Sequence, residues 1–226
     1  MKIKVVVATR EKQENFLKNT ATGHSLTRNI LPFVEVRLFP SNSQGLSTVY
    51  NQAIKETIGE DIILLFVHDD VHLIDFYIWH RIIEGLTHFD VLGLAGNISR
   101  SPNQPTWAHI DTKFVWDNPR NLSGVVGTGN GLQDLEINAY GSPRQKVKLL
   151  DGLFLAVRSK TIFEKNLTFD EQFKFHFYDL DFCRQAETKN LTCGTWDISV
   201  IHESGGDFGN PDWMEQHQKY LAKWGS

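Results

Sequence analysis

The sequence predicts an α/β fold, a single domain built on a mostly parallel, twisted sheet with helices on both faces. Ile62–Val67 is an unbroken apolar run, which is typical of a strand buried on both faces. Further apolar segments alternate with segments that have a helical pattern, and this order favours parallel strands joined by right-handed crossovers. The length of 226 residues fits one large domain.

The first 96 residues carry the regular alternation. Strands are expected at residues 5–8, 34–39, 62–67 and 91–95, and helices at residues 11–18, 46–54 and 75–86. Apolar residues at i, i+3, i+4, i+7 and i+8 from Leu46 to Ile54 predict one buried helical stripe. Ser47 and Asp75 are candidate N-caps, and Gly59 is a candidate helix stop. Residues 19–29 are polar, and a second short helix is possible there.

Residues 97–146 interrupt this alternation. The segment is rich in Gly, Asn, Pro and Ser, and it predicts short hairpins and a mobile lid. Gly124–Gly131 is expected to be its most flexible part. This run lacks the GxGxxG spacing, and no β–α–β unit surrounds it, so it does not indicate a dinucleotide site.

Residues 147–226 return to alternating elements. Strands are expected at residues 147–150, 153–157, 191–196 and 198–202, and helices at residues 159–165, up to about 188, and from Pro211 onward. Asn210 and Pro211 are typical of a helix start. The chain is therefore read as one domain in three parts, residues 1–96, 97–146 and 147–226.

The composition excludes some function classes. A net charge of −4 gives no electrostatic basis for nucleic-acid binding. No segment approaches the ~20 consecutive apolar residues of a membrane span. The only two cysteines, Cys183 and Cys193, are expected to be unpaired and reduced, which favours a cytoplasmic location.

Polar residues that follow apolar strands are the candidate functional residues, because ligands bind outside the carboxyl ends of strands in such sheets. His68, Asp69, Asp70 and His72 come directly after the central strand. If the chain stays extended, His68, Asp70 and His72 share one side and form a plausible divalent-metal set. Two similar positions are the Asp179–Asp181 segment and His202. A metal site with a separate carboxylate base suits a displacement on a phosphorylated donor.

Several segments, in this order, carry a resemblance to one enzyme family. They are Gly45–Asn51 (GLSTVYN), Val67–Val71 (VHDDV), Asp151–Arg158 (DGLFLAVR), Phe169–Glu171 (FDE) and Tyr178–Arg184 (YDLDFCR). Together they resemble the nucleotide-sugar glycosyltransferases of the GT-A fold, and in particular the inverting, family-two-like bacterial sugar transferases. The resemblance extends from Val5 to His202 and implies a Rossmann-like nucleotide-binding half before the flexible insert and an acceptor and catalytic half after it.

The resemblance also implies roles for individual residues. The site residues by role are Thr9, Arg10, Asn51 and Asp69 at the donor nucleotide; His68, Asp70 and His202 at Mn²⁺ or Mg²⁺; Asp179 as general base, with Asp181 as its substitute; and Asp151 and Gly152 at the sugars. Trp107 is added as a candidate for stacking on an acceptor sugar. The implied donor is a nucleoside-diphosphate sugar, with a UDP-sugar as the default. The implied acceptor is a saccharide or a lipid-linked hydroxyl, as in bacterial polysaccharide biosynthesis.

Two departures from the family pattern leave alternatives open. His68 stands where the family has the first Asp of its D-x-D motif, and Tyr178 stands where it has the Glu of its E-D pair. A His-rich site could instead belong to a metal-dependent hydrolase or phosphoesterase. A catalytically silent module that binds nucleotide sugars is a third possibility.

Overall fold

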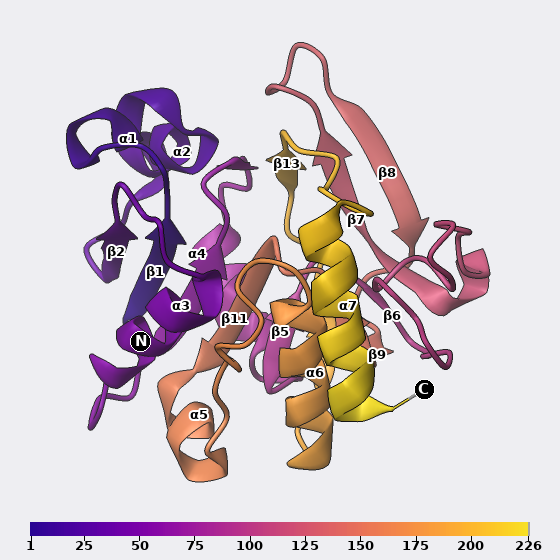
Figure 1. Cartoon of the computed structure of the whole chain (residues 1–226). Helices are drawn as coiled ribbons and strands as arrows, with labels where there is room; N and C mark the ends of the chain where they lie inside the picture. The colour runs from indigo at the N-terminus through magenta and orange to yellow at the C-terminus, as the bar shows by residue number, and fades with distance from the viewer. Residues whose placement is uncertain (226) are drawn as a thin grey trace.

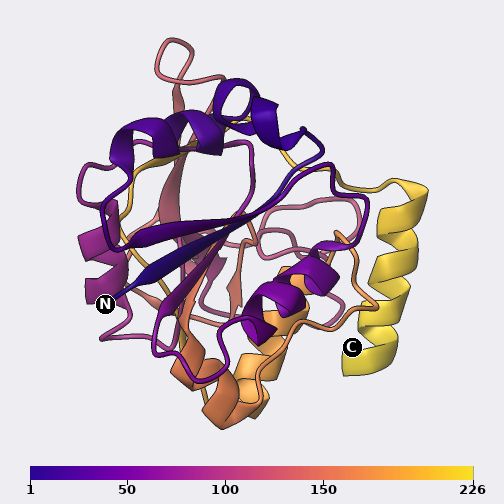
Figure 2. The same ribbon diagram turned by 90° about the vertical axis from the view of Figure 1, so that its left-hand side faces the viewer.

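The computed structural model describes residues 1–225, which form two mixed sheets with helices around them (Figure 1). The first sheet has the strand order β2-β1-β3-β11-β5-β12-β9. Its strands are β1 (Ile3–Ala8), β2 (Val34–Phe39), β3 (Ile63–Val67), β5 (Val91–Gly93), β9 (Lys146–Val147), β11 (Phe154–Arg158) and β12 (Cys193–Thr195). The fold class is thus confirmed as α/β, and Figure 2 shows helices on both sides of the first strands.

The second sheet has the order β10-β6-β7-β13-β4, with β8 paired to β7. Its strands are β4 (Val71–Leu73), β6 (Ala95–Asn97), β7 (Leu122–Thr128), β8 (Glu136–Gly141), β10 (Leu149–Leu150) and β13 (Val200–His202). The expected strand at residues 91–95 is therefore two short strands, β5 and β6, which belong to different sheets.

Both sheets are mixed: the first three strands are parallel as expected, and β12 is parallel to β5, but β9 and β11 run antiparallel to their neighbours. β1 pairs in parallel with both β2 and β3, with Val5 opposite Val36 and Leu65. β11 then runs antiparallel to both β3 and β5. The reason is visible at the end of β3, where the His68 amide donates to the Leu153 carbonyl at 3.1 Å. The chain enters β11 from the rim at which β3 ends, so it must run the opposite way.

The helices are close to those expected from the sequence. They are α1 (Gln13–Asn19), α2 (Ala21–Asn29), α3 (Leu46–Lys55), α4 (Ile78–Gly85), α5 (Ser159–Lys165), α6 (Tyr178–Thr188) and α7 (Pro211–Trp224), with a short 3₁₀ turn η1 (Pro119–Asn121). Asn210 caps α7 as expected, accepting from the Trp213 amide. Ser47 does not cap α3: Gly45 is the N-cap, and the Ser47 hydroxyl donates to the Phe173 carbonyl at 2.6 Å.

Two further helix boundaries also differ from expectation. α4 begins at Ile78 with Tyr77 as N-cap, and Asp75 supports this start by accepting from the Tyr77 amide at 2.7 Å. α3 ends at Lys55, before Gly59, which lies in the following turn with φ of +83°.

The segment 97–146 is built into the second sheet. The predicted hairpin is present as β7 and β8, but β7 also pairs with β6 and β13. The interpretation of Gly124–Gly131 as a flexible loop is therefore wrong for its first half, which is strand. At Gly124 (φ +109°) an added Cβ would lie 1.9 Å from the Leu94 carbonyl oxygen, so the glycine allows the strands to approach. Small residues here serve close packing, although their composition is typical of a loop.

The core surrounds β3, whose five residues are all buried. Tyr50 from α3, Phe66 and Phe169 meet there with ring centroids 4.7–5.3 Å apart. Cys183 and Cys193 are buried and free, as expected. Among residues 1–225 no helix combines the length and the apolar character that a membrane crossing requires.

Candidate active site

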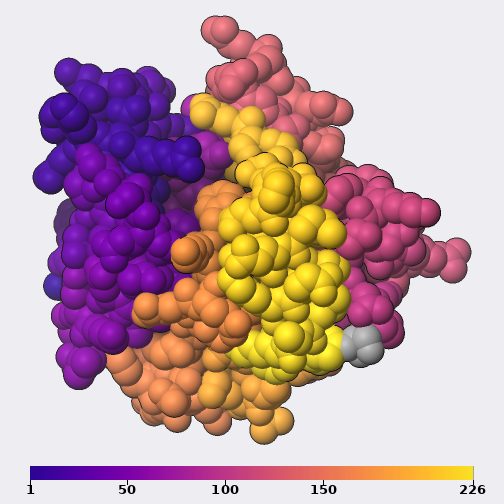
Figure 3. Space-filling model, in the orientation of Figure 1, coloured from indigo at the N-terminus to yellow at the C-terminus, as the bar shows by residue number. Residues whose placement is uncertain are grey.

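A cavity of about 790 Å³ opens at the rim where β1 and β3 end. Its wall includes the turn after β3, the Asp151–Leu153 turn before β11, the start of α6 and the loop after β13. The space-filling view shows the hollow between the indigo and purple N-terminal part and the yellow C-terminal segment (Figure 3). The site therefore lies outside the strand ends, as the sequence predicted.

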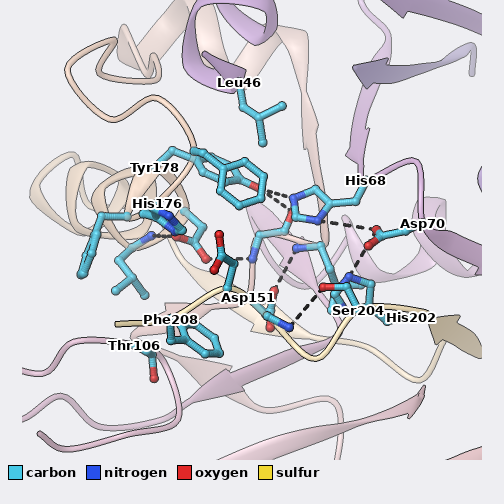
Figure 4. Close-up of a pocket in the computed structure, with 18 of the residues that line it drawn as sticks. Leu46, His68, Asp70, Thr106, Asp151, His176, Tyr178, His202, Ser204 and Phe208 are labelled. Atoms are coloured by element: carbon cyan, nitrogen blue, oxygen red, sulfur yellow. Dashed lines mark hydrogen bonds and ion pairs between the residues drawn. The ribbon is translucent and has the colours of Figure 1, made fainter. Parts of the chain in front are cut away.

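Three side chains form the candidate metal centre, His68, Asp70 and His202 (Figure 4). Asp70 Oδ1 lies 3.9 Å from His68 Nδ1 and 3.3 Å from His202 Nε2. One possible ligand atom from each residue lies within 4.8 Å of the others. The group forms because β13 pairs in the second sheet with β4 and places His202 opposite Val71. Asp70 Oδ1 and His202 Nε2 are buried, and apart from this ion pair neither has a hydrogen-bond partner among the residues described.

The charges in this group are mutually dependent. Burial opposes ionisation of Asp70, but His202 and His68 outweigh it and lower its pKa. Burial would also lower the pKa of His202, but Asp70 raises it overall. The pKa of His68 is lowered by burial, against the opposing effect of Asp70, so its ring is neutral at pH 7. A neutral imidazole is the form that binds a metal ion.

These residues fit a divalent metal ion. The set offers two imidazoles and one carboxylate, a donor set that suits Mn²⁺ and other transition metals better than Mg²⁺, which prefers oxygen ligands. Asp70 Oδ1 and His202 Nε2 face each other at 3.3 Å and have no further hydrogen-bond partner within residues 1–225, so a bound ion would give each a second partner. Within residues 1–225 this is the single group of its kind.

His72 does not join this group, contrary to expectation. Its Nε2 lies 2.9 Å from Glu203 Oε1, and the residue lies in β4, opposite Ile201. The prediction assumed an extended chain from His68 to His72, but Asp69 and Asp70 form a turn. That turn breaks the alternation on which the prediction depended.

Asp179 lies in the first turn of α6 and faces the same cavity. Its carboxylate accepts from the Gly152 amide at 2.9 Å and from the Leu180 amide at 2.8 Å. Burial and the nearby charge of Asp151 raise the pKa of Asp179 to about 7, although the two amides act in the opposite direction. A carboxylate that titrates near neutral pH is suited to general-base chemistry.

Asp151, Gly152 and Trp107 also line the cavity, but Trp107 is not free to stack on a sugar. Its Nε1 donates to Asp151 Oδ2 at 2.7 Å, and the side chain is 7% exposed. The more exposed ring is Trp116, which stacks on Tyr140 with the planes 22° apart. The structure thus corrects the stacking prediction for Trp107 and places Trp116 at the cavity wall.

Thr9, Arg10 and Asp69 line the cavity near the ends of β1 and β3. Burial raises the pKa of Asp69, while the Thr9 hydroxyl acts in the opposite direction. Asn51 lies outside the cavity: its side chain forms hydrogen bonds of 2.8 and 3.0 Å with the Phe169 backbone. Asn51, although it matches a family motif, therefore links α3 to the segment before α6.

Asp181 also lies outside the cavity, so it is not placed to substitute for Asp179. It is fully buried, and its carboxylate accepts from Trp224 Nε1, Lys223 Nζ and Gln185 Nε2, each at 2.7 Å. Helical geometry explains the outcome, because residues two apart point to different sides of a helix. Asp181 instead attaches α7 to α6.

Sequence reasoning missed part of the cavity wall. His176 is only 9% exposed and lines the cavity. Phe208 and the glycines before it, in the loop after β13, also contribute. Phe173, Phe175 and Phe177 alternate along the sequence, but the segment does not form a strand, so this alternation does not assign an inward side.

Comparisons with known proteins agree with this architecture. A family model described as "Glycosyltransferase like family" matches residues 34–224. The solved structure of GalNAc-T7 with UDP, GalNAc and Mn²⁺ has a TM-score of 0.59 and 9% identity, covering 99% of this chain and 48% of that one. Other similar structures are S. aureus TarS (TM-score 0.49, 15% identity, 99% and 39% covered) and A197 from STIV (0.45, 12%, 90% and 83%). No curated protein matches this sequence.

This chain spans less than half the length of two of these structures, GalNAc-T7 and TarS. At 9% identity, the likeness to GalNAc-T7 is a likeness of fold. It supports the GT-A assignment, since nearly all of this chain aligns with that structure.

Proposed function

The chain belongs to the glycosyltransferase-like family, and from this premise we propose that it transfers a sugar from a nucleoside-diphosphate sugar to an acceptor hydroxyl, with inversion at the anomeric carbon and with the help of a divalent metal ion. One observation carries the proposal. A carboxylate with a pKa of about 7, Asp179, faces the same cavity as the group formed by His68, Asp70 and His202. The family match supports sugar transfer. The presence of Asp179 and the three possible metal ligands in one cavity supports inversion with the help of a metal ion.

In the proposed reaction, Asp179 accepts the proton of the acceptor hydroxyl. The acceptor oxygen then forms a bond to the anomeric carbon while the bond from that carbon to the diphosphate oxygen breaks. Attack from the face opposite the leaving group inverts the configuration. The amides of Gly152 and Leu180 hold the carboxylate in place, so its geometry is set before the substrates bind.

His68, Asp70 and His202 would hold Mn²⁺ or Mg²⁺ beside the donor. The bound ion would neutralise charge on the departing diphosphate. Thr9, Arg10 and Asp69 are proposed to contact the nucleotide, because they line the cavity at the end of β1. Residues 1–96 would then form the nucleotide side and residues 147–226 the acceptor side, with the 97–146 segment contributing Trp116 to the wall.

UDP-sugars are the first donors to test, and a saccharide or a lipid-linked hydroxyl is the proposed acceptor class. A role in polysaccharide biosynthesis in the cytoplasm of a bacterium would be consistent with these substrates. A hydrolase with two metal ions is less well supported, since His72 pairs with Glu203 and only one ligand group is found within residues 1–225.

A thermal-shift screen tests the proposal directly. UDP, GDP and dTDP, with their sugars, would be added with Mn²⁺, with Mg²⁺ or with EDTA. A ligand that binds only the folded protein raises the Tm. At a concentration 100 times its Kd, such a ligand adds about 2.7 kcal/mol to the free energy of unfolding. We expect one nucleotide to raise the Tm with Mn²⁺, to raise it less with Mg²⁺, and to have little effect with EDTA. No shift with any of the three nucleotides in Mn²⁺ would contradict the proposal.

The pH dependence follows from the state of Asp179. Because its pKa is about 7 and the base must be deprotonated, kcat/KM for transfer should rise about tenfold per pH unit below 7 and level off above it. The measurement is a profile from pH 5 to 9 at saturating Mn²⁺. Asp151→Asn should move the acid limb to lower pH, because the charge of Asp151 raises that pKa. A flat profile between pH 5 and 7 would argue against Asp179 as the base.

A further inference from the structure

The two residues that depart from the family's motifs, His68 and Tyr178, touch each other. They are 110 positions apart in the sequence, yet His68 Nε2 lies 2.7 Å from the Tyr178 hydroxyl (Figure 4). The same hydroxyl lies 2.8 Å from the Gly152 carbonyl oxygen. Two substitutions that look independent in the sequence therefore form one hydrogen-bonded unit at the cavity.

Counting protons fixes the direction of these bonds. A carbonyl oxygen can only accept, so the single hydroxyl proton of Tyr178 is donated to Gly152. The Tyr178 oxygen must then accept from His68, which requires the proton of the neutral imidazole to be on Nε2. The opposite assignment would leave two acceptor oxygens facing each other at 2.8 Å without a proton between them.

With its proton on Nε2, the neutral ring has a free lone pair on the other nitrogen, Nδ1. His68 Nδ1 is the atom that lies 3.9 Å from Asp70 Oδ1, in the group with His202. In metal sites, the hydrogen bond made by one ring nitrogen sets which nitrogen binds the metal and how the ring is oriented. The contact between Tyr178 and His68 has this form.

We propose that Tyr178 is a positioning residue that holds His68 in the Nε2-protonated form, so that His68 Nδ1 completes a metal centre of two imidazoles and one carboxylate. The inference rests on the metal site of the proposed function and adds to it a residue outside the ligand set.

Tyr178 is well fixed for such a role. Its side chain is 3% exposed, and its ring packs against Tyr50 and Phe169 with centroids 5.9 and 6.0 Å apart. A Cβ at position 152 would lie 2.3 Å from the hydroxyl oxygen, so the glycine allows the hydroxyl to reach between the turn and His68. The orienting group therefore has little freedom to move away from the imidazole.

The experiment compares metal binding and histidine tautomers in the full chain. Isothermal titration with Mn²⁺ alone, without nucleotide, should give a Kd that rises about 10- to 100-fold in Tyr178→Phe, the usual cost of losing an outer-shell partner. Tyr220→Phe is the matched control, since Tyr220 is equally buried on α7 and lies outside the cavity. We expect its Mn²⁺ affinity to stay within about twofold of the wild type.

A second readout needs no substitution. In a ¹⁵N spectrum of the metal-free wild type, the His68 ring should show its proton on Nε2, and Tyr178→Phe should abolish this preference. A His68 ring protonated on Nδ1 in the wild type would overturn the inference even if Tyr178→Phe failed to fold. Equal Mn²⁺ affinity in the wild type and Tyr178→Phe would overturn it as well.

The same assays separate this inference from the proposed function. Loss of Mn²⁺ affinity in Tyr178→Phe without any nucleotide binding to the wild type would leave Tyr178 as a positioning residue and remove the transferase proposal. If Tyr178→Phe keeps both its nucleotide binding and its Mn²⁺ affinity, the transferase proposal stands and the positioning role of Tyr178 falls. If the wild type binds no Mn²⁺, the positioning role falls, and the nucleotide screen decides the transferase proposal separately.

Discussion

Asp179→Asn is expected to lower kcat for sugar transfer by about 10²–10⁴-fold, the contribution typical of a positioned general base. An asparagine has nearly the same shape as aspartate but cannot accept the proton of the acceptor hydroxyl. One side-chain oxygen remains to accept from an amide, either that of Gly152 or that of Leu180. The residues proposed to bind the nucleotide and the metal lie on other elements, so the Kd for the nucleotide with Mn²⁺ should change little.

The control for this change is Asp61→Asn. Asp61 is exposed just before β3 and lies outside the cavity, so the same chemical change should leave kcat within about twofold of the wild type. Transfer would be followed by release of the nucleoside diphosphate, with circular dichroism to confirm folding. A variant that folds, binds nucleotide and keeps full activity would show that another group takes the proton.

Asp70→Asn should abolish metal-dependent nucleotide binding. Asp70 is the single carboxylate in the ligand group, so its replacement removes the negative charge of that group. We expect the Kd for Mn²⁺ to rise by at least about 100-fold, the upper end of the cost of an outer-shell change. The pKa of His202 should fall at the same time, because Asp70 is what raises it above its usual value.

Asp69→Asn is the neighbouring control for Asp70. Asp69 lies in the same turn but outside the group formed by His68, Asp70 and His202, so Mn²⁺ affinity should be kept. Titration calorimetry would measure the ion, and histidine resonances followed against pH would measure the His202 pKa. Equal Mn²⁺ affinity in Asp70→Asn and the wild type would rule out Asp70 as a ligand.

Much of the fold was predictable because local patterns are read directly from the chain. Ile62–Val67 has no polar residue, and it forms the buried central strand β3. Asn210 and Pro211 start α7 as expected, since capping depends on adjacent residues. Strand direction was less predictable. β11 is antiparallel to β3 because of where the chain enters the sheet, and no local pattern carries that information.

In the candidate site, too, some residues were predictable from the sequence and others were not. His68 and Asp70 were identified from their places after an apolar strand, Asp179 was also matched to a family motif, and all three line the cavity. Asn51 and Asp181 were carried over from motif positions, and they instead bond to neighbouring elements. A motif specifies residue type and spacing, whereas the side of the helix that faces the cavity depends on packing.

The sequence by itself determined the α/β class, the order of the elements and the chemical types gathered at the strand ends. The tertiary structure decided which of those groups meet. It brought His202 to Asp70 and His68 but left His72 paired with Glu203, and it joined Tyr178 to His68. The reason is physical: secondary structure follows from contacts a few residues apart, whereas a site depends on strand pairing across more than a hundred residues, and a single turn at Asp69 and Asp70 redirects every side chain after it.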